Sequence, residues 1–184
     1  YLSALAERLE AFGYNGPLLI THSGGGVMSV EAAREIPARM CQSGPAAGVM
    51  AGANLGRATN RPNVINLDVG GTSADVSLAR GGRPLIRAEW NVDFNIVINF
   101  PSVDVATIGA GGGSIARVDA GGALKVGPES AGARPGPACY DLGGEAPTVT
   151  DANLVLGRLG GDTKLAGRVA LRTDLAEQAM ARVS

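Results

Sequence analysis

The sequence predicts an α/β fold in which a mixed sheet is flanked by helices and joined by glycine-rich turns. Two observations support this prediction: stretches with helical spacing alternate with short apolar runs, and the 28 glycines gather in clusters between those runs. Glycine is thereby about twice as frequent as its usual share of about 7%. Because the clusters follow apolar runs and show no collagen period, they indicate tight turns rather than disorder.

The first sixty residues are predicted to be mainly helical. Leucines and a phenylalanine recur at helical spacing over residues 2–12, and residues 17–20 form a short buried strand. Ser29 is placed to cap a helix through about residue 34, and Pro37 prevents its simple continuation. A further helix starts at Ser43, where proline follows near the first turn. Its many small residues allow it to lie very close to a neighbour.

The chain becomes β-rich from residue 64 onward. Strands at 64–69 and 75–79 flank a short turn, and a third segment follows at 85–90. Apolar residues alternate over 92–100, at Val92, Phe94, Ile96, Ile98 and Phe100, which predicts a half-buried strand. Residues 114–126 are predicted to form a hairpin that turns at Ala120-Gly121-Gly122.

The last third of the chain is predicted to hold an ordered loop and two helices. Residues 127–150 contain many glycines and prolines, Thr150 is placed to cap a helix over 151–159, and Thr173 to cap a final one. The sequence has no clear repeat and no linker long enough to separate independent domains. Since helical spacing is already running at Tyr1, we expect the chain to be a piece of a longer protein.

The chemistry is concentrated at 65–75, which reads Ile-Asn-Leu-Asp-Val-Gly-Gly-Thr-Ser-Ala-Asp. Two carboxylates, two glycines and two hydroxyls gather there: Asp68, Gly70, Gly71, Thr72, Ser73 and Asp75. Glycines let the backbone approach a ligand, successive turn N–H groups can form an anion-binding concavity, and carboxylates can hold a cation directly or through water. The pattern favours a site for phosphate with its Mg²⁺, although the same residue types also build ordinary hairpin turns.

A second glycine cluster follows at 108–115, Ile-Gly-Ala-Gly-Gly-Gly-Ser-Ile. The dinucleotide-binding fingerprint is not met because Ser114 occupies its sixth position, and no lysine completes a phosphate-binding P-loop. Two interpretations are open: a bulge-rich turn between strands, or a backbone surface against which a nucleotide or substrate lies. In the second interpretation the binding residues are Gly109, Gly111, Gly112 and Gly113.

Several classes of function have no support in the composition. His22 is the only histidine, so no histidine cluster for a metal exists, and neither Ser23 nor Ser43 lies in a nucleophile elbow. The net charge of −1 provides no basic field for nucleic acid, and no run of 18 apolar residues predicts a membrane span. With Cys41 and Cys139 as the only cysteines, we expect a reducing, cytoplasmic setting.

Six segments, in this order and spacing, resemble the hydantoinase A / 5-oxoprolinase family. They are Ser-Gly-Pro-Ala-Ala-Gly (43–48), Asp-Val-Gly-Gly-Thr-Ser-Ala-Asp-Val-Ser-Leu (68–78), Thr-Ile-Gly-Ala-Gly-Gly-Gly-Ser-Ile-Ala (107–116), Val-Gly-Pro-Glu-Ser-Ala-Gly-Ala (126–133), Pro-Gly-Pro-Ala-Cys-Tyr (135–140) and Thr-Val-Thr-Asp-Ala-Asn-Leu-Val-Leu-Gly-Arg-Leu (148–159). The resemblance covers about residues 15–165. It identifies residues 1–184 as a partial hydantoinase A-type domain, with an N-terminal lobe and a C-terminal part expected outside the chain.

The resemblance implies an actin-like (ribonuclease H-like) ATPase lobe. In that superfamily, which includes sugar kinases and Hsp70, two lobes close over ATP and each supplies an Asp-Gly-Gly-Thr-type turn. The turn at 68–75 matches the one in the later lobe. By the same resemblance, Asp68 is expected to hold Mg²⁺ or Mn²⁺ or to orient an attacking group, and Asp75 to be the second catalytic carboxylate. The amides and hydroxyls of Gly70–Ser73 are then expected to hold the phosphates of ATP.

The resemblance also implies an activity and partners. Family members open cyclic amides such as hydantoins and 5-oxoproline with ATP, and relatives are subunits of acetone and acetophenone carboxylases. We therefore expect a small-molecule substrate, a hydantoinase B-like partner and an oligomer. One departure leaves the substrate class open: Asp104 is followed by Val105 and Ala106, where many members have histidine two residues after the aspartate. A cyclic amidase and an ATPase module that powers a partner both remain possible, and Asp104 is favoured as functional.

Overall fold

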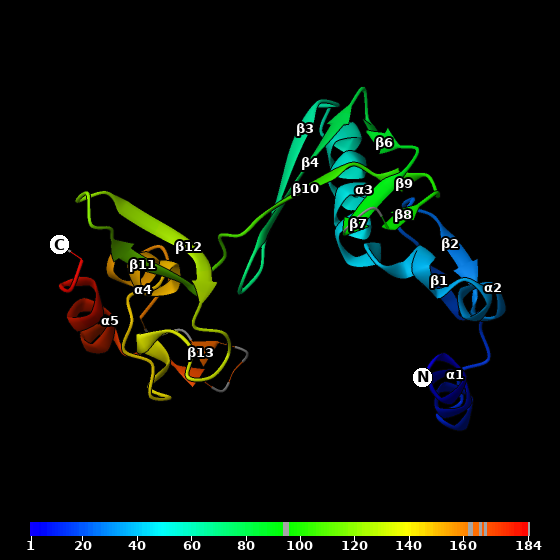
Figure 1. The fold of residues 1–184 in the computed structure, drawn as a ribbon. Coiled ribbons are helices and arrows are strands. Elements are labelled where there is room, and N and C mark those ends of the chain that lie inside the picture. Colours follow the sequence, from blue (N-terminus) through cyan, green and yellow to red (C-terminus); the bar gives the residue numbers. More distant parts are fainter. Residues whose placement is uncertain (94–95, 162–163, 166, 168, 184) are drawn as a thin grey trace. The chain divides into compact units, whose positions relative to one another are not determined.

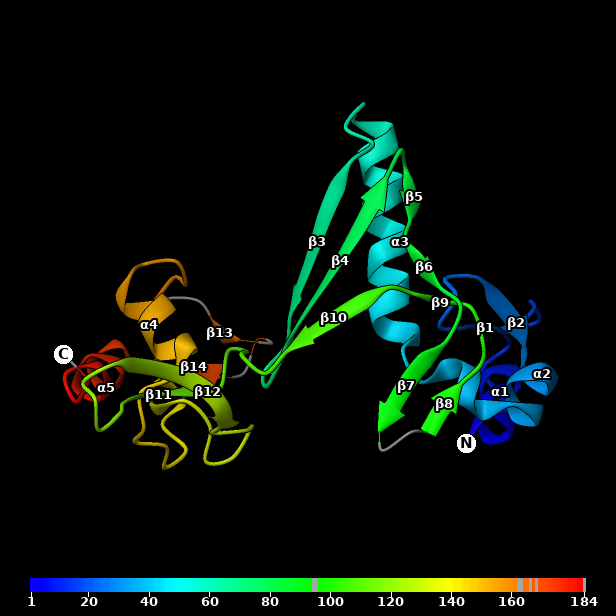
Figure 2. The same cartoon turned by 45° about the horizontal axis from the view of Figure 1, so that its top comes forward.

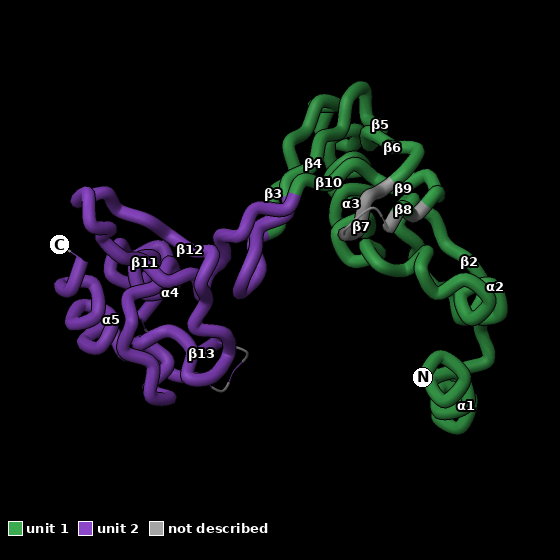
Figure 3. The backbone as a smooth tube through the Cα atoms, viewed as in Figure 1, with its two compact units in different colours: residues 1–68, 76–106 green, residues 69–75, 107–184 purple. Residues whose placement is uncertain are grey.

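The computed structural model describes residues 1–93, 96–161, 164–165, 167 and 169–183. These residues form two compact units (Figure 3). Unit 1 comprises residues 1–68 and 76–106, and unit 2 comprises residues 69–75 and 107–184. The boundaries between the units fall within strands β3, β4 and β10. Figure 1 shows the order of the elements.

The first half of unit 1 contains the predicted helices. Its elements are α1 (Leu2–Ala11), β1 (Leu19–Thr21), β2 (Val27–Ser29), α2 (Val30–Glu35), the 3₁₀ helix η1 (Pro37–Met40) and α3 (Ser43–Ala58). Ser29 caps α2 as predicted, because its hydroxyl accepts a hydrogen bond from the backbone N–H of Ala32. Strands β1 and β2 pair antiparallel.

A small sheet carries the predicted turn. It contains β3 (Val64–Val69), β4 (Ala74–Arg80), β5 (Arg83–Pro84) and β10 (Val105–Ile108), in the order β10-β4-β3 with β5 paired to β4. Strands β3 and β4 are joined through residues 70–73 and run in opposite directions, as predicted (Figure 2). Strands β4 and β5 meet at a two-residue turn in which Gly81 and Gly82 both have positive φ.

Helix α3 packs closely on β3, as its small residues predict. A Cβ atom at Gly52 would overlap the side chain of Asn66. One at Gly56 would lie 2.5 Å from Val64 Cγ2 and 2.7 Å from the carbonyl oxygen of Arg61. Glycine at these two positions therefore sets how near the helix comes to the sheet.

Two strand predictions in unit 1 are wrong. The segment 85–90 is divided between β6 (Ile86–Arg87) and β7 (Trp90–Asp93), and β6 pairs with β9 (Ser102–Val103). The alternating segment 92–100 is no single strand: β7 pairs antiparallel with β8 (Ile96–Ile98). Phe94, which belonged to that alternation, lies outside the described residues. Apolar alternation looks alike on both arms of a hairpin, so a period of two does not reveal where the chain reverses.

The mixed sheet stays a prediction, because the pairings with a defined register do not include the one between β10 and β4. Every strand pairing whose register the structure gives is antiparallel. The α/β class itself is confirmed.

Unit 2 contains the predicted hairpin and two helices. Its elements are β11 (Ser114–Val118), β12 (Leu124–Ser130), the 3₁₀ helix η2 (Ala138–Tyr140), α4 (Val149–Val155), β13 (Lys164–Leu165), β14 (Val169–Ala170) and α5 (Thr173–Met180). Strands β11 and β12 pair antiparallel. The Asp119 carboxylate holds the turn between them by accepting hydrogen bonds from the N–H groups of Gly121 and Ala123, both at 2.9 Å.

Both helix caps predicted in this unit are wrong. Thr148, not Thr150, caps α4, which ends at Val155. The Thr148 hydroxyl accepts from the N–H of Asp151, and the Asp151 carboxylate accepts from the N–H of Thr148, which is a capping box. The position of Asp151 decides which threonine is the cap. Thr173 is already the first helical residue of α5, with Arg172 as its N-cap.

Each unit has a small aliphatic core. In unit 1, Ala46 and Val49 of α3 pack with Val103 and Val105. In unit 2, the buried cluster joins η2, α4 and α5: Cys139, Leu154, Leu171 and Ala176, with Tyr140, Leu159 and Leu165 packed against it. These cores contain few aromatic rings, as expected from a chain with 4% aromatic residues.

We expect Gly56→Ala to destabilise the intact protein by about 1–3 kcal/mol, because the new methyl group meets backbone and valine atoms that have no room to move. Gly48→Ala is the matched control in the same helix. Nothing lies within 4 Å of a Cβ at Gly48, so the higher helix propensity of alanine should stabilise by up to about 1 kcal/mol. Equilibrium urea unfolding measures both changes. A stabilising Gly56→Ala variant would contradict the close packing of α3 on β3.

Candidate active site

The predicted turn at residues 70–73 presents unpaired backbone donors. The N–H of Gly70 donates to the carbonyl oxygen of Ser73 at 2.8 Å and closes the turn. The N–H groups of Gly71, Thr72 and Ser73 have no acceptor among the residues that the structure describes. Consecutive unpaired N–H groups at an exposed turn are the features of an anion-binding concavity.

The second glycine cluster is brought directly against this turn. The N–H of Gly112 donates to the carbonyl oxygen of Gly70 at 2.9 Å, and the N–H of Gly113 donates to that of Gly71 at 2.6 Å. A Cβ at Gly111 would lie 2.6 Å from the Gly70 carbonyl oxygen and 2.7 Å from the Ser73 nitrogen. Only glycine allows this approach between two backbones, so the cluster fixes the conformation of the turn.

Two residues to which the sequence assigned no role at the site, Ser114 and Thr150, hold the glycine cluster in place. The hydroxyl of Ser114, which is fully buried, accepts a hydrogen bond from the N–H of Gly111 at 2.8 Å. Both the N–H and the hydroxyl of Thr150 donate to the carbonyl oxygen of Gly112, each at 2.8 Å. Ser114 and Thr150 therefore position the loop that positions the turn. In the sequence, both residues lie in segments that resemble the family, 107–116 and 148–159. Membership of a segment does not reveal what the residue contacts.

The turn and the cluster together border a groove of about 510 Å³ within unit 2. It is lined by Val69, Gly70, Gly71, Thr72, Gly112 and Gly113, together with Gly132, Ala133, Pro137, Tyr140, Thr150, Leu159 and Leu165. Gly109 is not among these residues; a Cβ there would make an ordinary contact with Pro128. The volume lies within the usual range for small-molecule sites, about 300–1,000 Å³.

The two predicted catalytic carboxylates lie in different surroundings. Asp75 Oδ1 accepts a hydrogen bond from the Thr107 hydroxyl at 2.6 Å. Asp68 is exposed, and its carboxylate has no hydrogen bond or ion pair within the described part of the chain. No group of three or more histidine, cysteine or acidic side chains is placed to hold a metal ion among those residues. A single carboxylate suits Mg²⁺ better than it suits most other metal ions, because Mg²⁺ is commonly held by one or two carboxylates together with water and phosphate oxygens.

The complete chain, residues 1–184, matches the hydantoinase/oxoprolinase family model. The chain belongs to the hydantoinase/oxoprolinase family. It is 41% identical to the acetophenone carboxylase gamma subunit of Aromatoleum aromaticum, over 97% of this chain and 24% of that protein.

Two solved structures have the same fold. One is the nucleotide-free structure of an acetone carboxylase, from work on ATP-dependent acetone carboxylation. It is 34% identical to this chain with a TM-score of 0.79, and the match covers 97% of this chain and 25% of the carboxylase chain. The ATP-dependent caprolactamase of Pseudomonas jessenii is 38% identical with a TM-score of 0.78 and covers 98% of this chain and 26% of its own. The chain spans about a quarter of the length of the relatives that it matches.

Two further segments that resemble the family, at 135–140 and 148–159, meet around one buried carboxylate. Asp151 is fully buried. It accepts hydrogen bonds from the N–H of Cys139 at 2.8 Å, the N–H of Ala138 at 3.3 Å, and the N–H and hydroxyl of Thr148 at 3.0 and 2.7 Å. A buried carboxylate with four donors joins η2 to α4, and these elements carry Tyr140 and Thr150 to the groove.

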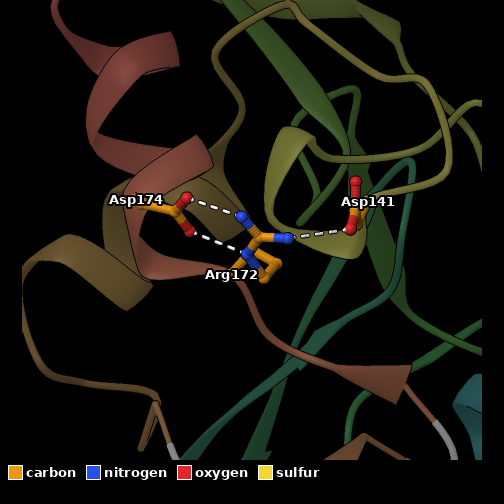
Figure 4. A network of polar contacts seen from close by, with 3 residues as sticks. All are labelled: Asp141, Arg172 and Asp174. Atoms are coloured by element: carbon orange, nitrogen blue, oxygen red, sulfur yellow. Dashed lines mark hydrogen bonds and ion pairs between the residues drawn. The ribbon is translucent and has the colours of Figure 1, made fainter.

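An exposed ion-pair network attaches α5 to the same elements. Arg172 donates through Nε and Nη2 to the two carboxylate oxygens of Asp174, at 2.9 and 2.7 Å, and through Nη1 to Asp141 at 3.1 Å (Figure 4). Its backbone N–H donates to the carbonyl oxygen of Cys139 at 2.9 Å. The hydrogen bonds from Arg172 lower the pKa of the Asp174 carboxyl.

The remaining side chains discussed from the sequence make structural contacts in unit 1. His22 Nδ1 accepts from the N–H of Gly24 at 3.0 Å, and Ser23 is buried with its hydroxyl donating to the carbonyl oxygen of Arg39 at 2.7 Å. Asp104 forms an ion pair with Arg87 at 2.5 Å. The pair gives Asp104 an ionic partner, and its functional role stays a prediction. None of the helices in the described residues combines the length and apolar character needed to cross a bilayer.

We expect Gly111→Ala to lower nucleotide binding by the intact enzyme at least tenfold, because its methyl group would push the glycine cluster away from the turn. Gly109→Ala is the matched control in the same loop, where a Cβ makes only an ordinary contact at 3.4 Å. Titration calorimetry with Mg-ATP measures binding, and thermal unfolding reports the fold. Equal affinities of the two variants would contradict the role of this close approach.

We expect iodoacetamide at about pH 8 to label Cys41 and leave Cys139 unmodified in the folded protein. Burial raises the pKa of the Cys139 thiol to about 12, with a further contribution from Asp151, so the reactive thiolate does not form. Cys41 is exposed. Mass spectrometry of wild type and Cys41→Ser, each folded and in guanidinium chloride, reads out the result. Rapid labelling of Cys139 in the folded Cys41→Ser variant would show that the η2–α4 cluster is open.

Proposed function

We propose that this chain forms the phosphate-binding part of an ATP-dependent enzyme that opens a cyclic amide by activating its carbonyl. The observation that carries the proposal is the turn at 70–73, with three consecutive unpaired N–H groups and a conformation fixed by the glycine cluster. Family membership and the ATP-dependent caprolactamase of Pseudomonas jessenii support the choice of nucleotide and substrate class.

The residues at the turn suit a nucleotide phosphate. The N–H groups of Gly71, Thr72 and Ser73 would donate to phosphate oxygens. Apart from the two neighbours of Gly71 in the chain, no described residue lies within 4 Å of a Cβ position at Gly71. The Thr72 hydroxyl lies 3.5 Å from that of Ser130, which gives the same place two further polar groups. Asp68, directly before the turn, would help to hold Mg²⁺ or Mn²⁺.

The need for ATP follows from the chemistry of amides. An amide carbonyl is stabilised by resonance, and its nitrogen is a poor leaving group. Transfer of a phosphoryl group to the amide oxygen would make the ring carbon electrophilic enough for water to attack. In such transfers a protein acts mainly by positioning groups and neutralising charge, which is what a rigid turn of backbone donors provides.

We further propose that the turn is the later-lobe half of an actin-like ATPase clamp. A second turn of this kind, a hydantoinase B-like partner and an oligomeric enzyme would complete the active site. A cytoplasmic location fits the two free cysteines.

A carboxylase subunit is the second candidate function. Its support is the 41% identity to the acetophenone carboxylase gamma subunit and the similarity to the acetone carboxylase structure. Assays of the intact protein with ATP against hydantoin, 5-oxoproline, and acetone with bicarbonate distinguish the two functions. A hydantoinase B-like chain or additional carboxylase subunits that co-purify give an independent answer.

We expect Asp68→Asn to lower ATP-dependent turnover of the intact enzyme by more than about a hundredfold, which is the rate loss typical of removing one preorganised contact. The free energy of unfolding should change by about 1 kcal/mol or less. Asparagine keeps the size of the side chain and one acceptor oxygen but loses the charge that attracts the cation. Turnover and thermal unfolding are measured on the same preparation.

The matched control for this substitution is Asp141→Asn. Asp141 has a left-handed φ of 57°, which asparagine tolerates, and the variant loses only an exposed ion pair with Arg172. It should keep its turnover. If Asp68→Asn also keeps wild-type turnover, or loses activity only in proportion to its unfolded fraction, the catalytic role of Asp68 is excluded.

A further inference from the structure

Strand β3 is packed on one face and open on the other. Helix α3 packs against Val64 and Asn66 through its two close-packing glycines, and Figure 2 shows the helix along one side of the strand. Successive side chains of a strand point to opposite faces, so Ile65 and Leu67 point away from α3. These two side chains are 74% and 65% exposed.

The neighbouring strand β4 repeats this division. Ser77 and Ala79 are each 4% exposed, whereas Leu78 between them is 45% exposed. The two strands therefore expose three large apolar side chains, which we call the open surface: Ile65, Leu67 and Leu78. Apolar side chains that gather in this way, unlike single exposed ones, mark an interaction surface.

Strand β3 also lies at the edge of its sheet, in the order β10-β4-β3. Apart from the pairing with β4, the backbone of residues 64–69 makes no hydrogen bond to another part of the described chain. About half of the N–H and C=O groups of an edge strand point outward, and such a row of unpaired groups is a template for a further strand. The sheet is therefore open at its edge as well as on its face.

The open surface is too small to hold two copies of the chain together. Strands β3 and β4 contain six and seven residues, and only about half of these side chains lie on one face. A stable interface between separate chains uses about 20–30 residues a side. A segment of the same polypeptide can dock on a smaller area, because its connection to the chain makes the association intramolecular.

The relatives contain polypeptide that could supply such a segment. This chain spans 24–28% of three related proteins, and its fold occurs in the caprolactamase structure as 26% of a longer chain. About three quarters of each relative therefore lies outside the region that matches this chain.

We propose that further segments of the intact enzyme's own polypeptide cover the open surface with apolar side chains and add a strand to the free edge of β3. Paired on both edges, β3 would be an interior strand. Asp68, which follows Leu67, would then be held on a rigid element. The inference goes beyond the proposed function and holds whether or not the turn at 70–73 binds phosphate.

The test uses the intact polypeptide, purified without other subunits, and measures how fast iodoacetamide labels Leu67→Cys. Mass spectrometry of the peptide that contains position 67 reads out this thiol alone. A covered thiol should react at least about a hundredfold more slowly in the folded enzyme than in guanidinium chloride. Ala120→Cys, at the exposed turn between β11 and β12, is the control and should react within about tenfold of its unfolded rate.

Hydrogen exchange of the wild-type enzyme gives a second measurement, which needs no substitution. All amides of residues 64–69 should be protected if β3 is paired on both edges, whereas a free edge leaves alternate amides to exchange rapidly.

Three results would overturn the inference. If Leu67→Cys reacts as readily as Ala120→Cys, the surface is open in the intact enzyme. If its protection is lost on about hundredfold dilution, or arises only when another subunit is added, a separate chain covers the surface. If alternate amides of residues 64–69 exchange rapidly, no strand is added, and this result decides the matter even if Leu67→Cys does not fold.

Discussion

The close approach of two glycine backbones is the constraint on which the site depends. Gly112 and Gly113 donate to the carbonyl oxygens of Gly70 and Gly71, and a side chain at Gly111 would separate the two segments. Once the carbonyls of the turn are engaged in this way, the N–H groups of residues 71–73 are left without protein acceptors in the described chain. Backbone packing thus leaves these N–H groups available to a ligand, and the site needs no charged side chain to supply its donors.

A second polar anchor, Asp151, serves unit 2 where aromatic packing is scarce. Its buried carboxylate accepts four hydrogen bonds and fixes η2 against α4. Carboxylates buried without partners are strongly unfavourable, so these donors and the carboxylate have to be present together. The same arrangement places Thr150 on the carbonyl oxygen of Gly112 and Tyr140 beside the groove. The glycine cluster and Tyr140 are therefore supported by one network.

This arrangement suits reactions in which the protein orients charge. Phosphoryl transfer needs fixed donors, a cation and little covalent participation by the protein. A hydrolase and a carboxylase that both activate a weak electrophile with ATP can share such a part and differ elsewhere. The identities to the carboxylase and caprolactamase relatives are accordingly similar, 34–41%.

The sequence by itself determined the hairpin of β3 and β4, the cap at Ser29, the close-packing helix α3 and the family, because each depends on neighbouring residues or on ordered motifs. Tertiary structure alone decided that Gly111 faces the turn, that Ser114 and Thr150 hold the loop, and that Asp104 pairs with Arg87. These contacts join residues whose closeness depends on the folded chain, so local propensity and spacing carry no information about them. The cap of α4 is different: Asp151 stands three residues after Thr148, in the spacing of a capping box, so the sequence itself distinguished Thr148 from Thr150.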